Sequence, residues 1–298
     1  MNKIVILTDS SCCLNSKLMA DHGVAEIIPM HFIFRGKEYD ADGDWKTFNA
    51  KEYYDAMRNG ERIKSAQIND QEYAKLFKKY LELGNDILSI SCTSALSASV
   101  KASYAARDQL KDQYPNQKIR CVDSANCCYS LAMLIKDASI LRDQGLDIDE
   151  IVDWIEENKH NYNEIGTVEK LSYLRQAGRI SASAAFFGGM LSVKPIVVYD
   201  MEGHNVAIEK VKGRKKSFEV IADYIKKYAN LENHKTIYIA HGDALEEAHQ
   251  LGDLIQAKFS EKLEFVYDYV EPGVASSVGP GTMIVGFYAC KEMRLLSK

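Results

Sequence analysis

The stretch KIVILTDSS, residues 3–11, joins a short apolar run to a turn rich in hydroxyl groups. The same order recurs in ILSISCTS at 87–94 and in IRCVDS at 119–124, with segments of helical spacing between and after them. Short buried strands that alternate with helices are typical of βαβ units on a parallel sheet. The sequence therefore predicts an α/β fold in which the three hydroxyl-rich turns lie at the carboxyl edge of one sheet. Ligands of such folds bind at this edge.

After a helical pattern at 151–159, the pattern of apolar and polar residues changes. We expect two domains, an N-terminal α/β domain with a parallel sheet over residues 1–162 and a C-terminal α/β domain over 163–298. Further strands are predicted at 194–198, 207–211, 236–240, 264–270 and 283–287, and helices at 168–175, 217–228 and 244–258. The boundary between the domains is expected near 161–166.

The composition is that of an ordinary globular protein. The chain has 298 residues, of which 46% are hydrophobic and 27% are charged. These values exclude a disordered, collagen-like or coiled-coil chain. Lys and Arg number 37 against 42 for Asp and Glu, which gives a formal net charge of −5. A mildly acidic balance removes the electrostatic basis for general nucleic-acid binding, so the expected ligand is a small molecule or another protein.

The sequence points to the cytoplasm. The apolar run Ile4–Leu7 is too short for the core of a signal peptide. The longest stretch without a charged side chain, 272–290, contains four glycines and two prolines, Pro272 and Pro280. Such a stretch is a poor membrane span, so no stable membrane insertion is expected.

The seven cysteines are expected to be reduced thiols. Cys12 and Cys13 are adjacent, as are Cys127 and Cys128, and neighbouring cysteines rarely bridge each other because their side chains diverge. The odd count would also leave one thiol over in a complete disulfide framework. None of the seven histidines is paired at the spacing of metal ligands, so no metal site is expected.

The common catalytic and nucleotide-binding motifs are missing. The chain contains no G-x-G-x-x-G, G-x-x-x-x-G-K-[ST], H-E-x-x-H or G-x-S-x-G. Their absence argues against a nucleotide-driven enzyme, a zinc protease or an α/β-hydrolase. No cofactor is therefore expected.

Serines at expected helix starts form the main candidate site. Ser65 lies in KSAQIND before one expected helix, and Ser97 and Ser99 lie in SALSASVKA at the start of another. Helix N-termini offer unpaired N–H groups and the positive end of the helix dipole, which suit a carboxylate or a phosphate. Helix capping is the alternative. Capping is favoured for Ser10 and Ser124, and both interpretations stay open for Ser65 and Ser97.

Four further features are candidates for function. Arg179 follows Gly178 in a turn between apolar segments, where its planar guanidinium suits a phosphate or a partner's carboxylate. The segment KVKGRKK at 210–216 is either a solvated hairpin rim or a docking patch for an acidic partner. His241 ends an expected strand, where a structural role is more common than a catalytic one. The apolar run 182–193 could line a cavity, although packing in the core is the commoner use.

Several short motifs, taken in their order along the chain, resemble the DegV family of bacterial lipid-binding proteins. This family includes the fatty-acid-binding subunit of bacterial fatty acid kinase. The motifs are TDSS (8–11), KSAQ (64–67), ISCTSALSAS (90–99), VDSA (122–125), LSYLRQAGRIS (171–181), KP (194–195), AHGD (240–243) and VGPG (278–281). The resemblance covers nearly the whole chain.

The resemblance implies a long-chain fatty acid held between the two domains. By position in the motifs, Ser65 and Ser97 would hydrogen-bond its carboxylate. Arg179, Lys212 and Arg214 would contribute to docking a kinase subunit. The chain departs from the family at Ser277, where kinase-coupled members often have a histidine, and at Ala98–Ser99, where Gly-Thr is usual. With Ser277 in place of that histidine, the contact that the histidine makes in those members is not expected here, whereas the serine contacts are.

The function expected from the sequence is that of a carrier. It would bind a long-chain fatty acid such as palmitate, serve lipid transport or fatty acid metabolism, and present the carboxyl group to a partner. The chain itself would not be an enzyme. The residues expected next to the ligand, besides Ser65 and Ser97, are Ser10, Ser99, Ser124, Ser277 and His241. The alternatives are a serine-dependent hydrolase that acts on a lipid-like ester through Ser97 and His241, and a scaffold that acts through 210–216.

Overall fold

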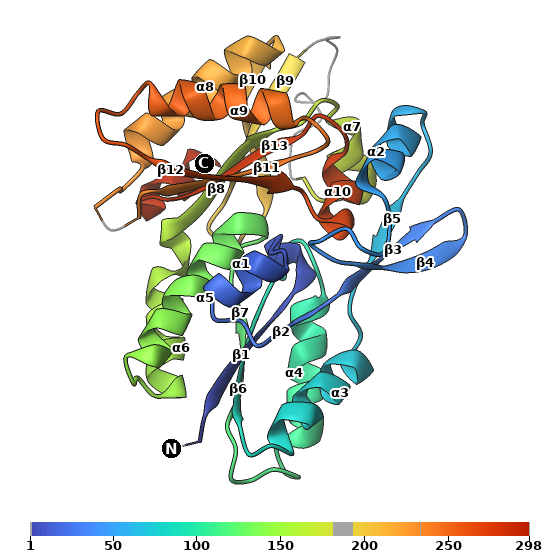
Figure 1. Ribbon diagram of the computed structural model, residues 1–298, viewed down its shortest axis with the longest axis vertical. Helices are drawn as coiled ribbons and strands as arrows, with labels where there is room; N and C mark the ends of the chain where they lie inside the picture. The colour runs from blue at the N-terminus through green and yellow to red at the C-terminus, as the bar shows by residue number, and fades with distance from the viewer. Residues whose placement is uncertain (1, 181–192, 233, 298) are drawn as a thin grey trace.

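The computed structural model describes residues 2–180, 193–232 and 234–297 (Figure 1). It contains a four-stranded parallel sheet, a six-stranded mixed sheet and a three-stranded antiparallel sheet. Helices cover the faces of the two larger sheets. This mixed architecture confirms the predicted α/β class.

The parallel sheet is formed by the segments that the hydroxyl-rich turns predicted. Its strand order is β2 (Glu26–Ile28), β1 (Ile4–Asp9), β6 (Asp86–Ser91) and β7 (Ile119–Asp123). Helices α3 (Asp70–Leu81) and α4 (Ser99–Leu110) lie on one face, and α5 (Cys128–Asp143) and α6 (Ile148–Asn158) on the other (Figure 1). Capping boxes define the starts of α3, at Asn69 and Glu72, and of α6, at Asp147 and Glu150.

The strand order of this sheet creates a topological switch point. From β1 the chain runs outward to β2 on one side, and later forms β6 and β7 on the other side. The carboxyl ends of β1 and β6 therefore flank a crevice, the usual place for a ligand in an open α/β sheet. The short 3₁₀ helix η1 (Ser10–Cys12) follows β1 at this crevice, and α1 (Ser16–Asp21) comes after it.

The six-stranded sheet is built entirely from the chain after residue 161. Its order is β10 (Asn205–Lys212), β9 (Val193–Tyr199), β8 (Tyr162–Thr167), β13 (Met283–Tyr288), β11 (Thr236–His241) and β12 (Glu264–Tyr269). Helices α8 (Arg214–Tyr228) and α9 (Leu245–Gln256) cover its outer face (Figure 1). On its inner face α5 packs against β8 and β13. The strand predictions are confirmed, and β8 is the strand that the sequence pattern did not predict.

A smaller sheet and three short helices close the side of the molecule next to the crevice. The sheet has the order β4 (Lys37–Ala41), β3 (Met30–Phe34) and β5 (Lys64–Ala66). The helices are α2 (Ala50–Arg58), α7 (Ser172–Ala177) and α10 (Pro272–Val278). The uncharged stretch 272–290 is thus divided between α10 and β13. Throughout the described chain, no helix is both long enough and apolar enough to cross a bilayer.

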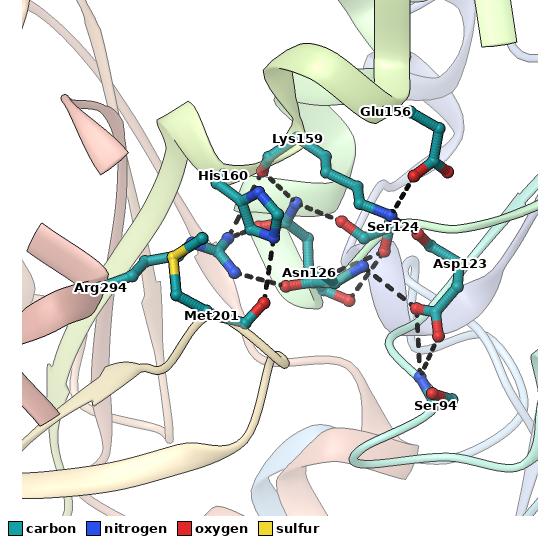
Figure 2. Close-up of polar contacts among 10 residues, drawn as sticks. Ser94, Asp123, Ser124, Asn126, Glu156, Lys159, His160, Met201 and Arg294 are labelled. Carbon is teal, nitrogen blue, oxygen red and sulfur yellow. Dashed lines mark hydrogen bonds and ion pairs between the residues drawn. The ribbon is translucent and has the colours of Figure 1, made fainter. Parts of the chain in front are cut away.

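A buried arginine ties the end of the chain to both large sheets. Arg294 lies in the 3₁₀ helix η4 (Lys291–Ser297) and is fully buried. Its guanidinium donates to the carbonyl oxygens of Ala125 at 2.8 Å and Tyr162 at 2.7 Å. It also donates to Asn126 Oδ1 at 2.6 Å (Figure 2). Ala125 and Asn126 precede α5, and Tyr162 begins β8. One side chain therefore links the turn after β7 to the six-stranded sheet.

Candidate functional site

A cavity of about 230 Å³ lies at the crevice between β1 and β6 and extends to the three-stranded sheet and α10. Ser11 follows β1, Cys92 follows β6, and Cys127 immediately precedes α5, and all three line this cavity. The predicted convergence of the three turns on one sheet edge is confirmed. We call this space the serine cavity, because Ser11, Ser65, Ser97 and Ser277 all line it.

Ser65 and Ser97 reach the serine cavity from different elements. Ser97 lies two residues before α4, as expected for a serine at a helix start. Ser65 lies in the strand β5, where it pairs with Phe32 of β3. The prediction that Ser65 stands at a helix N-terminus is wrong, because α3 begins only at Asp70 and the Asn69 side chain caps it. The two serines nevertheless share one cavity.

The hydroxyl of Ser97 is tied into the start of α4. Its Oγ lies 2.9 Å from Ser99 Oγ and accepts the Ser99 N–H at 3.3 Å. Ser99 Oγ also accepts the N–H of Ile68 at 3.4 Å, and Ser99 does not line the cavity. Ser97 is therefore held in place by Ser99, which acts behind it and connects α4 to the segment that follows β5.

The serine cavity adjoins a groove on the surface. The groove, of about 350 Å³, shares Ser65, Ser277 and Arg179 with the cavity. The groove is also lined by the cationic side chains of Arg58, Arg62, Lys64 and Lys170. Arg179 follows Gly178, which is left-handed at φ 68°, and its Nε donates to the Leu96 carbonyl at 2.9 Å. The predicted Gly-flanked turn is confirmed, and it lies where cavity and groove meet.

A second cavity continues from the serine cavity toward the six-stranded sheet. Its volume is about 60 Å³, and it shares Leu96, Leu174, Val274 and Val278 with the serine cavity. Strands β8, β9 and β13 supply much of the remaining wall, through Glu164, Thr167, Val197, Val198, Tyr199, Met283 and Ile284. We call it the apolar cavity. The sequence analysis did not single out Val274 and Val278 of α10, because no hydrophobic run marks this helix. The helix lies within the uncharged stretch 272–290. The run 182–193, for which core packing was favoured and a cavity lining was the alternative, lies outside the described residues except for Val193.

Ser10 and Ser124 lie close to the crevice without lining the serine cavity. Ser10 Oγ accepts the Met30 N–H at 2.9 Å. Ser124 Oγ accepts the Asn126 N–H and donates to the Asn126 carbonyl, both at 3.0 Å, within the polar network of Figure 2. The favoured interpretation of both as helix caps is wrong, because η1 is capped by Asp9 and α5 begins after Cys127. Both serines hold turns in shape.

His241 contacts Ala244 and Tyr269 and makes no contact with Ser97 in the described structure. It ends β11, its Nδ1 accepts the Ala244 N–H at 3.2 Å, and its ring packs against Tyr269 with centroids 4.6 Å apart. Burial lowers the pKa of His241 to about 4, so the ring is neutral. His241 does not line the serine cavity that contains Ser97. The pairing that the hydrolase alternative needs is not formed in the described structure.

The basic segment 210–216 is a strand–helix junction and not a hairpin rim. Lys212 ends β10 and is exposed, while Arg214 begins α8 and donates to Glu247 Oε2 of α9 at 2.8 Å. Arg179 lies at the other end of β10, where its carbonyl accepts from Asn205 Nδ2 at 3.0 Å. An eight-residue strand spans roughly 24 Å, so a partner that touches both ends must cover that distance.

Two buried carboxyl groups shape the wall of the serine cavity, and the sequence patterns did not single them out. Asp9 accepts the N–H of Cys92 at 2.8 Å and that of Ser11 at 3.1 Å. Glu271 caps α10 by accepting the N–H of Gly273 at 2.8 Å. Burial raises the pKa of Asp9, and it raises the pKa of Glu271 to about 8. These groups orient the cavity wall by holding its backbone.

No group of metal-binding side chains lies at the cavities in the described chain. Asp200, Glu202 and His204 form the one cluster of suitable ligand atoms among the described residues, in the turn between β9 and β10. Asp200 Oδ1 already accepts the backbone N–H groups of Glu202 and His204, as in an ordinary polar turn. This cluster is separate from the residues that line the serine cavity.

Comparison with known proteins gives a consistent picture. The family model described as "Uncharacterised protein, DegV family" matches residues 3–290. A DegV domain-containing protein of Clostridium perfringens is 34% identical over 289 residues, which cover 96% of this chain and 98% of the relative.

Two solved structures show the same fold. A stearic-acid-binding protein of Eubacterium ventriosum has a TM-score of 0.85 at 24% identity, with 98% of this chain and 99% of that chain covered. A DegV family protein of Thermus thermophilus, described by its fatty acid binding, has a TM-score of 0.82 at 24% identity, with 97% and 100% covered.

Proposed function

This chain belongs to the DegV family, and on that premise we propose that it binds a long-chain fatty acid in the serine and apolar cavities. Ser65 and Ser97 hydrogen-bond the carboxylate, and the tail extends past Leu96 and Leu174 into the apolar cavity. The observation that carries the proposal is that Ser65 and Ser97, from separate elements, line one cavity that adjoins an apolar one. The proteins of Eubacterium ventriosum and Thermus thermophilus that share the fold are described as binding fatty acids, which supports it.

The acyl tail and the carboxylate contribute differently to the binding free energy. Burial of an acyl chain contributes about 0.8 kcal/mol per methylene, so the tail supplies most of the affinity. A buried carboxylate is costly unless it is hydrogen-bonded, and each charge-assisted bond contributes about 1.5–3 kcal/mol. The serine hydroxyls therefore set the direction in which the acid enters, with its carboxylate toward the surface groove.

The proposed role is that of a cytoplasmic carrier in lipid transport or fatty acid metabolism. The groove that shares Ser65, Ser277 and Arg179 with the serine cavity gives a protein partner access to the carboxyl group. We propose a kinase subunit as that partner, with catalysis carried out by the partner. Lys212 is the exposed docking candidate, whereas Arg214 is already paired with Glu247.

Identification of the copurifying lipid tests the carrier proposal directly. Protein expressed in bacteria is denatured and extracted, and the extract is analysed by mass spectrometry; a long-chain fatty acid is the expected finding. Added acid at a hundred times its Kd should stabilise the delipidated protein by about 2.7 kcal/mol, which raises Tm by about 4 °C for a chain of this length. The absence of both a bound acid and a thermal shift would overturn the proposal.

Ser97→Ala tests the head-group contact. Loss of one charge-assisted hydrogen bond should weaken binding of octadecanoic acid at least about tenfold in a titration. Ser103→Ala is the matched control, because Ser103 lies in the same helix and donates to the Val100 carbonyl at 2.7 Å without lining the cavity. Equal affinities of the Ser97→Ala and Ser103→Ala proteins would remove Ser97 from the site.

A further inference from the structure

The two pairs of adjacent cysteines in the sequence meet each other in the fold. Cys13 follows η1 and Cys128 begins α5, and their Sγ atoms lie 2.9 Å apart. This separation is shorter than the roughly 3.5–4 Å of ordinary nonbonded carbon contacts. Both cysteines are buried, so the contact belongs to the interior of the protein.

The backbone at both cysteines is held in an uncommon conformation. Cys13 has φ 58° and Cys128 has φ 47°, in the left-handed region that residues other than glycine rarely adopt. Such a conformation persists only where the surrounding structure enforces it, and it is concentrated at functional sites. Two segments that are 115 residues apart in the chain thus present their thiols to each other from constrained turns.

The thiol pair borders the proposed ligand space. Cys128 lines the apolar cavity, and the neighbouring Cys127 lines both cavities. The Cys127 and Cys13 thiols both approach the Ser11 carbonyl, each at 3.7 Å. The apolar cavity has room for several water-sized molecules. Hydrogen peroxide is little larger than water, so it can reach Cys128 through this space, whereas a bulky oxidant such as glutathione disulfide cannot.

We propose that Cys13 and Cys128 form a reversible disulfide when hydrogen peroxide enters the ligand-free cavity, and that a bound fatty acid protects them. The protection rests on the proposed function, whereas the disulfide itself does not. The thiol pair thereby makes the oxidation state of the protein depend on whether its cavity is occupied.

The chemistry balances with peroxide as the oxidant. The Cys128 sulfur attacks one peroxide oxygen and the O–O bond breaks, which gives a sulfenic acid and, after proton transfer, water. The Cys13 sulfur then attacks the sulfenic sulfur, the S–O bond breaks, and the hydroxide takes the Cys13 proton as a second water. Two thiols and one hydrogen peroxide yield one disulfide and two waters. The sulfurs need to approach by only about 0.9 Å to reach the length of a disulfide bond.

The surroundings of the pair keep it reduced at rest. Burial raises the pKa of Cys13 to about 11 and that of Cys128 well above its usual value. The negative charge of the Glu271 carboxylate further raises the pKa of Cys13. The Glu164 carboxylate and the Cys127 thiol further raise the pKa of Cys128. Since the thiolate is the nucleophile, the reaction is expected to be slow compared with that of an exposed thiol.

The test uses the full chain with Cys290→Ser as background, because exposed Cys290 could form disulfides between molecules. Delipidated protein is treated with hydrogen peroxide, alkylated under denaturing conditions and digested without reductant. A cross-linked peptide pair that contains Cys13 and Cys128 is expected. The Tm of the oxidised protein should be about 5 °C higher than that of the reduced protein, and reduction should restore the original Tm. Cys13→Ser and Cys128→Ser should each abolish the cross-link, and Cys121→Ser should retain it.

A second arm measures the rate in the presence of saturating octadecanoic acid, with occupancy verified by native mass spectrometry. Cross-linking at least fivefold slower supports protection. An unchanged rate in verified complex would overturn the protective role. Absence of an internal disulfide, or a link between Cys92 and Cys127 instead, would overturn the proposed pair. Failure of the acid to bind at all would count against the proposed function and leave the disulfide to be judged by the first arm.

Discussion

Glu271 places a carboxyl group inside the protein, at the start of α10. Its two oxygens accept the N–H groups of Gly273 at 2.8 Å and Val274 at 2.6 Å. Burial raises the pKa of Glu271 to about 8, compared with 4.5 for the free side chain. The folded protein therefore holds this proton more tightly than the unfolded chain, and the resulting stability is complete below pH 4.5 and is lost as the pH rises through 8.

We expect Glu271→Gln to flatten the pH dependence of stability. The amide oxygen still accepts a helix N–H, but it no longer titrates. The free energy of unfolding of the natural protein should fall with pH between 5 and 8, by at most about 1.4 kcal/mol per unit from this group. Urea unfolding at several pH values measures the difference in unfolding free energy between the two proteins. Burial also raises the pKa of Glu164 to about 7. Because Glu164 is present in both proteins, its contribution cancels in this difference. Parallel curves would show that Glu271 does not titrate in this range.

At the level of single residues, the motif serines were predictable and the buried acids were not. Ser97 stands in a hydroxyl-rich segment and Ser65 in the motif KSAQ, and the sequence displays both directly. The role of Asp9 and Glu271 depends on burial and on backbone N–H groups that only the folded chain brings to them. The contact between Cys13 and Cys128 was hidden for the same reason, because 115 residues separate them.

At the scale of elements, Gly279 fixes how α10 packs against α7. Gly279 follows α10 at φ 78°, and a Cβ atom there would meet the ring of Tyr173 at 2.4 Å. Tyr173 belongs to α7, and its hydroxyl donates to the Met57 carbonyl of α2 at 3.1 Å. A side chain at 279 would therefore displace helices that carry residues of the serine cavity.

Gly279→Ala should destabilise the protein by about 3 kcal/mol, from backbone strain and from overpacking together. Gly145→Ala is the control, because Gly145 has φ 94° and nothing lies within 4 Å of a Cβ atom there. It reports the backbone strain alone, at about 1 kcal/mol. Urea denaturation gives both values, and binding of octadecanoic acid should weaken in Gly279→Ala only. Equal losses of stability in the two variants would contradict the packing argument.

The predictability of an element followed its length and its apolar content. Strand β1 contains the continuous apolar run Ile4–Leu7, and β6 contains the largely apolar ILSI at 87–90; this pattern predicted both the strands and the sheet edge. The three-stranded sheet was missed because β4 reads KEYDA, with three charged residues, and β5 has only three residues. The seven residues of α10, PGVASSV, have little helix propensity of their own. Such short elements depend on tertiary packing.

At the scale of the whole molecule, the two large sheets are held together around the cavities. Arg294 makes this connection on one side, through the Ala125 and Tyr162 carbonyls and the Asn126 side chain. The polar contacts in Figure 2 lie outside the lining of the serine and apolar cavities. A fatty acid in the cavities would make a second, independent connection between the sheets.

Arg294→Met tests whether these two connections are independent. Removal of the guanidinium leaves buried carbonyl oxygens without their donor, so we expect a loss of about 3–5 kcal/mol in stability. Arg294→Lys should lose less, because the ammonium group retains the charge and part of the hydrogen bonding. Tm is measured by differential scanning calorimetry for each protein with and without octadecanoic acid. Because ligand stabilisation depends only on concentration and Kd, the increase in Tm should be similar in all three proteins. Loss of that increase in Arg294→Met alone would show that Arg294 also maintains the shape of the cavities.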